Sequence, residues 1–261
     1  MGGSYRDIIV FLSAGDSAPA RLDLAVRLAQ QQAARLTGVD VSSAAVFNGH
    51  RREQAVGLQD AFEERLRSAG IRGKFRVCNR SDEAGWALYA HYADLVIAPT
   101  VGEATAGLVL PAVPEDVLLS AGVPIMVIPE LWKPTEVGQR IVVAWNASRE
   151  STRALHDAMP LLTRAKAVIL FSYDARQPVM REEMDLLTSH LAEHHVTAEP
   201  FTWPASADMT PTEALFSCLS ERDGDLIVAG GFGHSRRLEH LFGGTSEELL
   251  NSLTVPVFMS H

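Results

Sequence analysis

The chain carries one pattern of elements twice, and this duplication limits the folds that it can adopt. Each copy opens with an apolar run, a small or polar turn and a helical apolar period, and each ends with a short apolar run. The matching segments are Asp7–Ala29 and Arg140–Leu162, Ala93–Gly102 and Gly224–Gly233, and Gly122–Pro129 and Thr254–His261. The copies begin about 133 residues apart, which is too long for a solenoid repeat. We therefore expect a duplicated domain.

A short segment that breaks regular structure joins the two copies. It reads PELWKPTEVGQ, Pro129–Gln139, and its two prolines and one glycine are typical of a linker. A length of 261 residues also suits two domains of ordinary size. We place the first domain at residues 5–131 and the second at residues 138–261.

Strand-like and helix-like segments alternate regularly within each copy. In the second copy we expect one helix over Ser148–Leu162, with Ser148 as its cap, and another over Thr210–Arg222, with Pro211 in its first turn. The strand-like runs are nearly continuous in Val, Ile, Leu and Phe, as in parallel strands covered on both faces. The pattern predicts a doubly wound α/β sheet. Such sheets bind ligands beyond the carboxyl ends of the strands, at the point where the strand order reverses.

A glycine-rich segment follows the fourth strand of the second copy, at the position where a ligand loop is expected. Gly230 and Gly233 are separated by two residues, and nine residues later come Gly243, Gly244 and Thr245. Glycine lets the backbone approach a ligand closely. Thr245 with Glu248 forms a possible capping box, and a helix N-terminus attracts anions. The spacing alone fits a phosphate cradle, and it fits equally a set of turn and packing glycines.

The same segment, taken with its surroundings, resembles the ATP-binding signature of the universal stress protein family. The resemblance covers two tandem copies and includes IVVAWNASRE, DLIVAGGFGHS and the closing VPV. It implies two flavodoxin-like, Rossmann-like domains, each a five-stranded parallel sheet in the order 3-2-1-4-5 with helices on both faces. It also implies an ATP site, with or without Mg²⁺, that places Asn146 near the nucleoside and Ser172 near adenine. The remaining implied nucleotide-binding residues are Gly230, Gly233, Gly243, Gly244, Thr245 and Ser246.

The second copy departs from the family pattern in places, and the first copy has lost most of it. Asn146 stands where members often carry Asp, and Gly244 stands where Ser or Thr is frequent. In the first copy Pro99 replaces the first glycine, only Gly102 matches the second, and Ala112 and Val113 stand near the glycine pair. Ser13 takes the place of Asn146. We expect one nucleotide per chain, with the first copy acting as a packing partner or holding another ligand.

Charge and composition argue against several other functions. A net charge of −9 does not favour binding to nucleic acid or to anionic membranes, and no apolar run is long enough to span a bilayer. No secretion signal is visible, and Cys78 and Cys218 do not form a metal or disulfide motif, so we expect a cytoplasmic protein. His190 and His194 lie one helical turn apart without a third metal ligand in view, which favours a solvated helix face and no metal site.

Two classes of function remain open. The first is a stress-response protein that binds an adenine nucleotide with little or no turnover, because no carboxylate set for catalysis accompanies the glycine segment. At most, slow ATP hydrolysis is expected, and no catalytic residue is predicted. The alternative is a non-nucleotide adaptor or a small-ligand scaffold in stress signalling. The family resemblance further implies an intramolecular pseudo-dimer and a possible homodimer.

Overall fold

The structure is a computed structural model that describes residues 4–13, 18–41, 50–78, 83–100, 113–133, 136–173, 178–204, 208–231, 248–250 and 252–261. The described residues divide into two compact units, which we call the N-terminal unit (within residues 4–133) and the C-terminal unit (within residues 136–261). None of the described helices is both long enough and apolar enough to cross a membrane.

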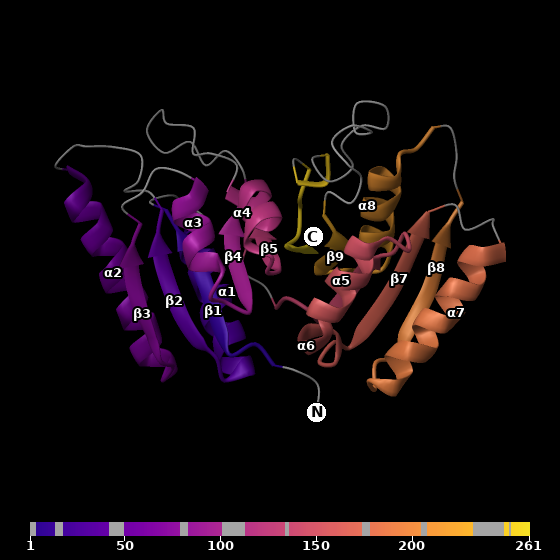
Figure 1. Ribbon diagram of the computed structural model, residues 1–261, viewed down its shortest axis with the longest axis horizontal. Coiled ribbons are helices and arrows are strands. Elements are labelled where there is room, and N and C mark those ends of the chain that lie inside the picture. Colours follow the sequence, from indigo (N-terminus) through magenta and orange to yellow (C-terminus); the bar gives the residue numbers. More distant parts are fainter. Residues whose placement is uncertain are drawn as a thin grey trace. The chain divides into compact units, whose positions relative to one another are not determined.

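The N-terminal unit alternates strands and helices around a five-stranded parallel sheet (Figure 1). Its strand order is β3-β2-β1-β4-β5, and every neighbouring pair is parallel. The predicted order 3-2-1-4-5 is therefore confirmed for this copy. The elements are β1 (Asp7–Leu12), α1 (Ala18–Gln32), β2 (Arg35–Asp40), α2 (His50–Ala69), β3 (Gly73–Val77), α3 (Glu83–Ala90), β4 (Leu95–Pro99), α4 (Val113–Ala121) and β5 (Ile125–Ile128).

The C-terminal unit has the same architecture. Its strand order is β8-β7-β6-β9-β10, which is again 3-2-1-4-5 when its strands are counted from β6, and all pairs are parallel. The elements are β6 (Arg140–Ala144), α5 (Arg149–Asp157), α6 (Met159–Leu162), β7 (Ala167–Tyr173), α7 (Pro178–Glu193), β8 (Ala198–Trp203), α8 (Pro211–Glu221), β9 (Leu226–Gly230) and β10 (Val257–Ser260).

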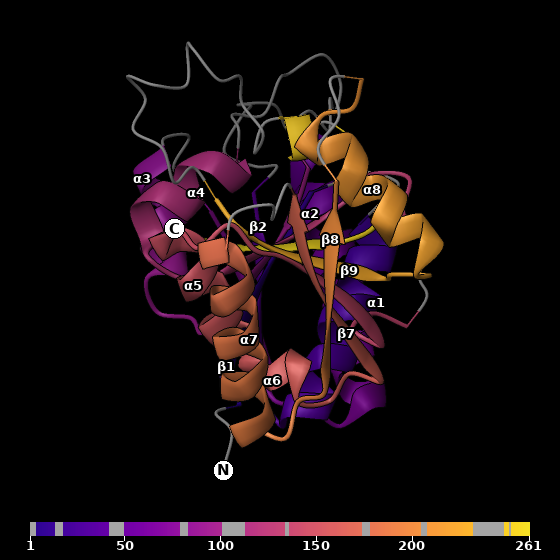
Figure 2. The same cartoon turned by 90° about the vertical axis from the view of Figure 1, so that its right-hand side faces the viewer.

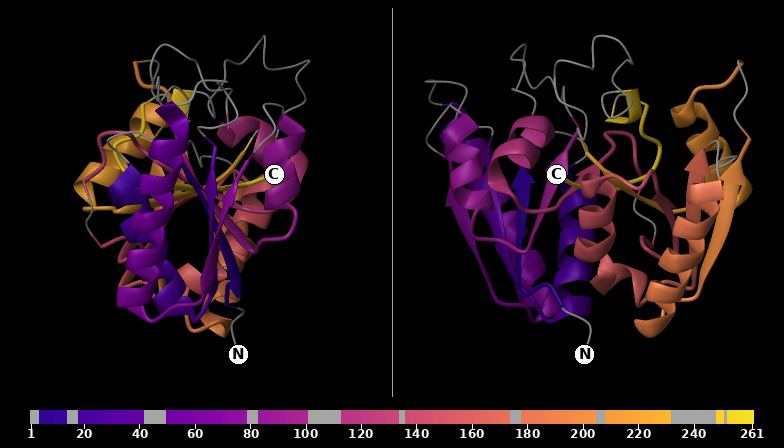
Figure 3. Two further views of the ribbon diagram at one scale, coloured as in Figure 1. Left: turned by 90° about the vertical axis from the view of Figure 1, so that its left-hand side faces the viewer. Right: turned by 45° about the vertical axis from the view of Figure 1, so that its right-hand side comes forward.

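Helices lie on both faces of each sheet, as a parallel sheet requires. In the N-terminal unit α2 packs on β2 and β3, while α4 packs on β4 and β5 and α3 packs mainly on α4. The left panel of Figure 3 shows α2 on one side of these strands and α3 with α4 on the other. In the C-terminal unit α7 and α8 flank β7 and β8 from opposite sides (Figure 2). The central strand β4 is fully buried and the central strand β6 is buried except at its two ends, whereas the edge strands β3 and β8 are partly exposed.

An aspartate at the start of the fourth strand ties that strand to the first strand in both units. The Asp94 carboxylate accepts hydrogen bonds from the backbone N–H groups of Arg6 and Asp7, at 2.6 and 2.9 Å. Its counterpart Asp225 accepts three, at 2.9 to 3.1 Å, from the backbone of residues 138–140. Burial raises the pKa of Asp225, although the three donors favour its charged form. The two copies therefore share this side-chain contact as well as their strand order.

The helix expected over Ser148–Leu162 is broken into α5 and α6, so this prediction was wrong in part. Pro160 lies in the first turn of α6, where its missing N–H costs nothing, but it cannot continue the hydrogen bonds of α5. Two predicted helix starts are confirmed. Ser148 caps α5 through its hydroxyl, and Pro211 opens α8 behind Thr210, which forms a capping box with Glu213.

A glycine in β2 makes room for an aromatic pair under α2. A Cβ added to Gly38 would stand 2.8 Å from the ring of Phe62, which lies against Phe75 with ring centroids 5.7 Å apart. We expect Gly38→Ala to lower the free energy of unfolding by about 1–3 kcal/mol, because the rings must move. The matched control is Gly57→Ala in α2, where a Cβ meets nothing within 4 Å, and which should stabilise by roughly 0.5–1 kcal/mol. Urea unfolding of the three proteins measures both effects, and an equal response of both positions would contradict this packing account.

Candidate functional site

The strand order of the C-terminal unit locates the crevice where ligands bind in doubly wound sheets. From β6 the chain moves outward to β7 and β8, and then returns to the other side of β6 to form β9 and β10. The order therefore reverses between β6 and β9, which pair in parallel from Ile141–Leu226 to Ala144–Ala229. Doubly wound sheets bind ligands at such a point, beyond the carboxyl ends of the two strands, and we call this place the crevice. Asn146 follows one of these ends and Gly230 forms the other.

Asn146 forms a tight turn at the start of α5. Its side-chain oxygen accepts a hydrogen bond from the Ser148 backbone N–H at 3.1 Å, and the intervening Ala147 has a positive φ of 57°. The Ser148 hydroxyl then accepts from the Ser151 backbone N–H at 3.1 Å. Asn146 is exposed, and its side-chain nitrogen has no hydrogen-bond partner among the described residues. This turn leaves a donor facing solvent beside the crevice.

Gly230 is explained by packing against α5, which is one of the two roles that the sequence left open. A Cβ at this position would lie 2.5 Å from the backbone nitrogen of Ser151 and 2.6 Å from the backbone carbon of Glu150. These are backbone atoms of the first turn of α5, so they cannot move away as the end of a flexible side chain can. The close approach therefore brings the helix N-terminus against the end of β9, at the edge of the crevice.

Ser172 lies in β7, the strand next to β6, and is buried with 1% of its surface exposed. Its hydroxyl is 3.2 Å from that of Thr202 in β8. Three of the predicted nucleotide-binding residues, Asn146, Ser172 and Gly230, thus lie at the carboxyl ends of three adjacent strands. The other five, Gly233, Gly243, Gly244, Thr245 and Ser246, are outside the described residues, as is the Thr245 half of the expected capping box. Glu248 is described, and it accepts a hydrogen bond from the Thr210 hydroxyl at 3.4 Å.

Two buried polar atoms at the same edge of the sheet keep unused hydrogen-bonding capacity within the described part of the chain. One is the indole nitrogen of Trp145, which directly follows β6, and the other is the hydroxyl of Ser260 at the end of β10. Ser260 pairs in register with Gly230. Buried polar groups normally have a partner, so both atoms suit a site that receives a polar ligand. Neither feature could be predicted from the sequence, because each depends on tertiary packing.

The corresponding edge of the N-terminal unit is built differently. Arg21 of α1 is completely buried and donates to the backbone oxygen of Phe11 at 2.8 Å and to the hydroxyl of Ser13 at 3.2 Å. By register, the residue at this place in the C-terminal unit is the small Ala154, and Asp40 stands where Ser172 stands. A buried guanidinium thus occupies the end of β1, beside the residue that replaces Asn146. Sequence reasoning missed Arg21 because charged residues are rarely buried.

Three histidines meet on the C-terminal unit, where only two were expected. The ring of His156 in α5 lies 5.3 Å from that of His190 in α7, and His190 lies 4.8 Å from His194, measured between centroids. His190 is half-buried, so the expected solvated helix face was wrong for this residue. Burial, followed by the charges of His194 and His156, lowers the pKa of His190. Within the described ranges no group of three His, Cys, Asp or Glu side chains has the arrangement of a metal site.

Among the described residues, the serine beside the crevice and the two cysteines do not have the surroundings of an activated nucleophile. Ser148 is engaged as a helix cap, and no base is bonded to its hydroxyl among the described residues. Cys78 and Cys218 are buried, and burial raises the pKa of Cys218 to about 11. This thiol is therefore protonated at neutral pH and is a poor nucleophile. The groups available at the crevice are the N-terminus of α5, the side-chain amide of Asn146 and the backbone at Gly230.

No protein-family model matches the chain, and no curated protein matches it. Among solved structures, a universal stress protein from Archaeoglobus fulgidus DSM 4304 superposes with a TM-score of 0.75 at 15% identity, covering 96% of this chain and 97% of that one. The chain has the fold of a universal stress protein. A protein of unknown function from Pseudomonas aeruginosa PAO1 also superposes, with a TM-score of 0.59 at 16% identity, covering 97% of this chain and 92% of that one.

The universal stress protein fold is present across both units, because the Archaeoglobus structure is matched over nearly its whole length. The expected tandem arrangement of two flavodoxin-like domains in one chain agrees with this match. At 15% identity, the superposition establishes the path of the backbone but not the roles of individual site residues. The residues at the crevice must therefore be tested in this chain.

The packing role of Gly230 predicts a loss of stability that is independent of any ligand. We expect Gly230→Ala to lower the free energy of unfolding by about 1–3 kcal/mol, because the added methyl group displaces the first turn of α5. Denaturant unfolding in the absence of nucleotide measures this change. An unaltered stability would contradict the packing role of Gly230.

The histidine cluster predicts a pH-dependent contribution to stability. Because the pKa of His190 is lower in the folded protein than its ordinary value of 6.5, the contribution is complete above pH 6.5 and is lost as the pH falls through the lowered pKa. We expect His190→Gln to make the free energy of unfolding fall less steeply below pH 6.5. His91→Gln, at an exposed histidine outside the cluster, is the control and should leave the profile unchanged. Identical slopes for the parent protein and His190→Gln would refute the effect.

Proposed function

We propose that the chain is a tandem universal stress protein that binds one adenine nucleotide, ATP, at the crevice of its C-terminal unit. The observation that carries this proposal is the position of the glycine-rich segment, which leaves the end of β9 at the point where the strand order reverses. Asn146 leaves the neighbouring strand at the same point. A segment that resembles an ATP signature thus begins at the place where this fold binds ligands.

The described residues fit a nucleotide in several respects. The α5 N-terminus lies against the end of β9 and supplies a partial positive charge. Asn146 keeps a free side-chain donor, and the unpartnered Trp145 indole offers a second donor at the same edge, within the described residues. We assign the phosphates to backbone N–H groups of the glycine segment, at Gly233, Gly243 and Gly244. Ser172 would lie toward the base, as the family resemblance implies.

The proposed role is nucleotide-dependent signalling in a stress response, with little or no turnover. Phosphoryl transfer to water needs a positioned nucleophile and usually carboxylate ligands for Mg²⁺. Among the described residues no such carboxylate set accompanies the crevice. We further propose that the protein acts in the cytoplasm, and that the two units pair as a pseudo-dimer. If no nucleotide binds, the alternative function, a non-nucleotide adaptor, becomes the favoured one.

The first test is the stoichiometry and affinity of ATP binding to the full chain. We expect isothermal titration calorimetry with ATP and Mg²⁺ to show one site per chain, because Arg21 fills the equivalent edge of the N-terminal unit. Two equivalent sites would contradict this reading of the N-terminal unit. If ATP, ADP and AMP all fail to bind at about millimolar concentration, the nucleotide proposal fails.

A matched pair of glycine variants tests the location of the site. Gly233→Val should abolish binding of ATP, because a side chain blocks the approach of the backbone, while Gly102→Val at the corresponding place in the first copy should not. Gly243→Val should behave as Gly233→Val does. Circular dichroism must show that each variant is folded. Equal loss in the Gly102 and Gly233 variants would place the nucleotide elsewhere.

A further inference from the structure

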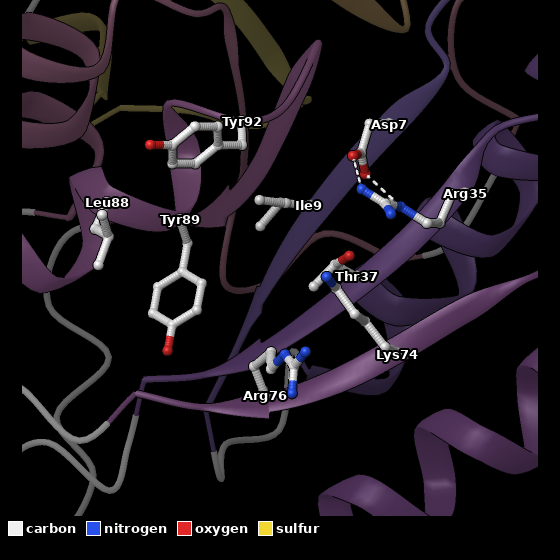
Figure 4. Close-up of a pocket in the computed structure, with 9 residues that line it drawn as sticks. All are labelled: Asp7, Ile9, Arg35, Thr37, Lys74, Arg76, Leu88, Tyr89 and Tyr92. Atoms are coloured by element: carbon white, nitrogen blue, oxygen red, sulfur yellow. Dashed lines mark hydrogen bonds and ion pairs between the residues drawn. The ribbon is translucent and has the colours of Figure 1, made fainter.

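A cavity of about 290 Å³ lies in the N-terminal unit, on the face of the sheet opposite α2. Strands β1 to β3 supply its floor, and Leu88, Tyr89 and Tyr92 supply one wall from α3 and the residues after it (Figure 4). The face is open because α3 packs mainly on α4 and does not extend over β2 and β3. Phe75 of β3 points the other way, toward Phe62 of α2. Alternation along β3 therefore directs Lys74 and Arg76 into the cavity.

The cavity contains positive charge that nothing in the described protein neutralises. Arg35 is held by Asp7 in an ion pair, which also raises the pKa of Arg35. Lys74 and Arg76 are both exposed, and neither has an ion-pair partner among the described residues. Two cations side by side in a chain of net charge −9 form a local attraction for an anion. Thr37 adds a buried hydroxyl-bearing side chain to the same floor.

The opposite wall is apolar and aromatic. Leu88 and Tyr92 are exposed over 48% and 75% of their surface, although they are large side chains with apolar parts. Together with Tyr89 and the buried Ile9, they give the cavity one surface suited to a flat ring. A volume of about 290 Å³ lies at the lower end of the range for small-molecule sites, so a single ring with one anionic group is the appropriate size.

At the corresponding place in the C-terminal unit, the protein's own side chains interact with one another. Register places Glu199 where Lys74 stands and Phe201 where Arg76 stands. There Arg222, at the end of α8, pairs with Glu199 at 2.8 Å and lies over the Phe201 ring at 4.7 Å. The charge of Arg222 is thus paired with Glu199 and stacked on Phe201 within the protein. In the N-terminal unit Lys74 replaces the acid and Arg76 replaces the aromatic ring. Near the end of α3, Tyr89 and Tyr92 line the cavity.

We propose that this cavity binds a small anionic ligand that carries an aromatic ring, such as an aromatic phosphate or carboxylate. Lys74 and Arg76 bind the anionic group, with Arg76 able to donate two parallel hydrogen bonds to its oxygens. Tyr92, Tyr89 and Leu88 contact the ring. The site is distinct from the proposed nucleotide crevice, since it lies in the other unit and on a sheet face instead of at the strand ends. The chain would then respond to two different ligands.

The test is an NMR titration of the full chain with phenyl phosphate, compared with inorganic phosphate and with neutral benzyl alcohol. We expect phenyl phosphate to bind more tightly than either, and its binding to weaken in about 1 M salt because the attraction is screened. Binding should persist in Gly243→Val, which separates it from the nucleotide site. Failure to bind at about 10 mM, or binding of benzyl alcohol equal to that of phenyl phosphate, would overturn the proposal.

Variants assign the two parts of the cavity. Lys74→Glu combined with Arg76→Phe introduces the residues found at these positions in the C-terminal unit and should weaken binding of phenyl phosphate about tenfold or more. The control, Lys133→Glu combined with Arg72→Phe, makes the same charge change at exposed positions outside the cavity and should have little effect. Tyr92→Ala should weaken phenyl phosphate but not inorganic phosphate.

Thermal unfolding must show that the variants are folded. If the double variant does not fold, Arg76→Gln is used in its place. Equal losses in the test and control variants would show that the ligand binds through general charge attraction, which overturns the site. A hexaglutamate peptide is the remaining competitor for the two cations. If it binds more tightly than phenyl phosphate with the same dependence on Lys74 and Arg76, the occupant is an acidic peptide and the small-molecule assignment is wrong.

Discussion

The hydrogen bonds that Asp225 accepts from the start of β6 fix the geometry on which the candidate nucleotide site depends. They join the first and fourth strands of the C-terminal unit at their amino ends, and parallel pairing then carries the alignment to the carboxyl ends. The crevice lies between these same two strands. Asp94 does the same for β1 and β4 in the N-terminal unit. Asp225 is partly buried, and a carboxylate that loses contact with water is costly unless it is hydrogen-bonded, so the contact favours one register of the two strands.

Both units keep this framework but differ at the strand ends. The C-terminal unit has Ala154 and Ser172 where the N-terminal unit has Arg21 and Asp40. The buried Arg21 takes up space at this edge and hydrogen-bonds to Phe11 and Ser13, whereas in the described part of the C-terminal unit the Trp145 indole and the Ser260 hydroxyl keep hydrogen-bonding capacity. The difference between the copies is therefore a matter of side-chain volume and charge at one edge of the sheet. It agrees with the loss of the glycine pattern from the first copy.

The sequence predicted those features that local patterns determine. Apolar runs identified the strands, the repeat identified two domains, and the cap at Ser148 and the proline at the start of α8 marked helix boundaries correctly. Features that arise from contacts across the fold could not be predicted. The approach of His156 to His190 joins two helices, and the reason for Gly230 lies in the backbone of α5. The cavity beside Lys74 depends on where α3 ends over the sheet, for which no local signal exists.

The replacement of Glu199 and Phe201 by Lys74 and Arg76 has a consequence for symmetry. In a homodimer of single-domain chains every substitution occurs twice, so a surface cannot change on one half alone. Here the two halves are encoded separately within one chain, and the cation pair occurs once, as does Arg21. Each half is free to acquire its own ligand chemistry while the shared backbone is kept. A covalent tandem of this kind can therefore become a device with two unlike inputs, which an assembly of identical subunits cannot encode.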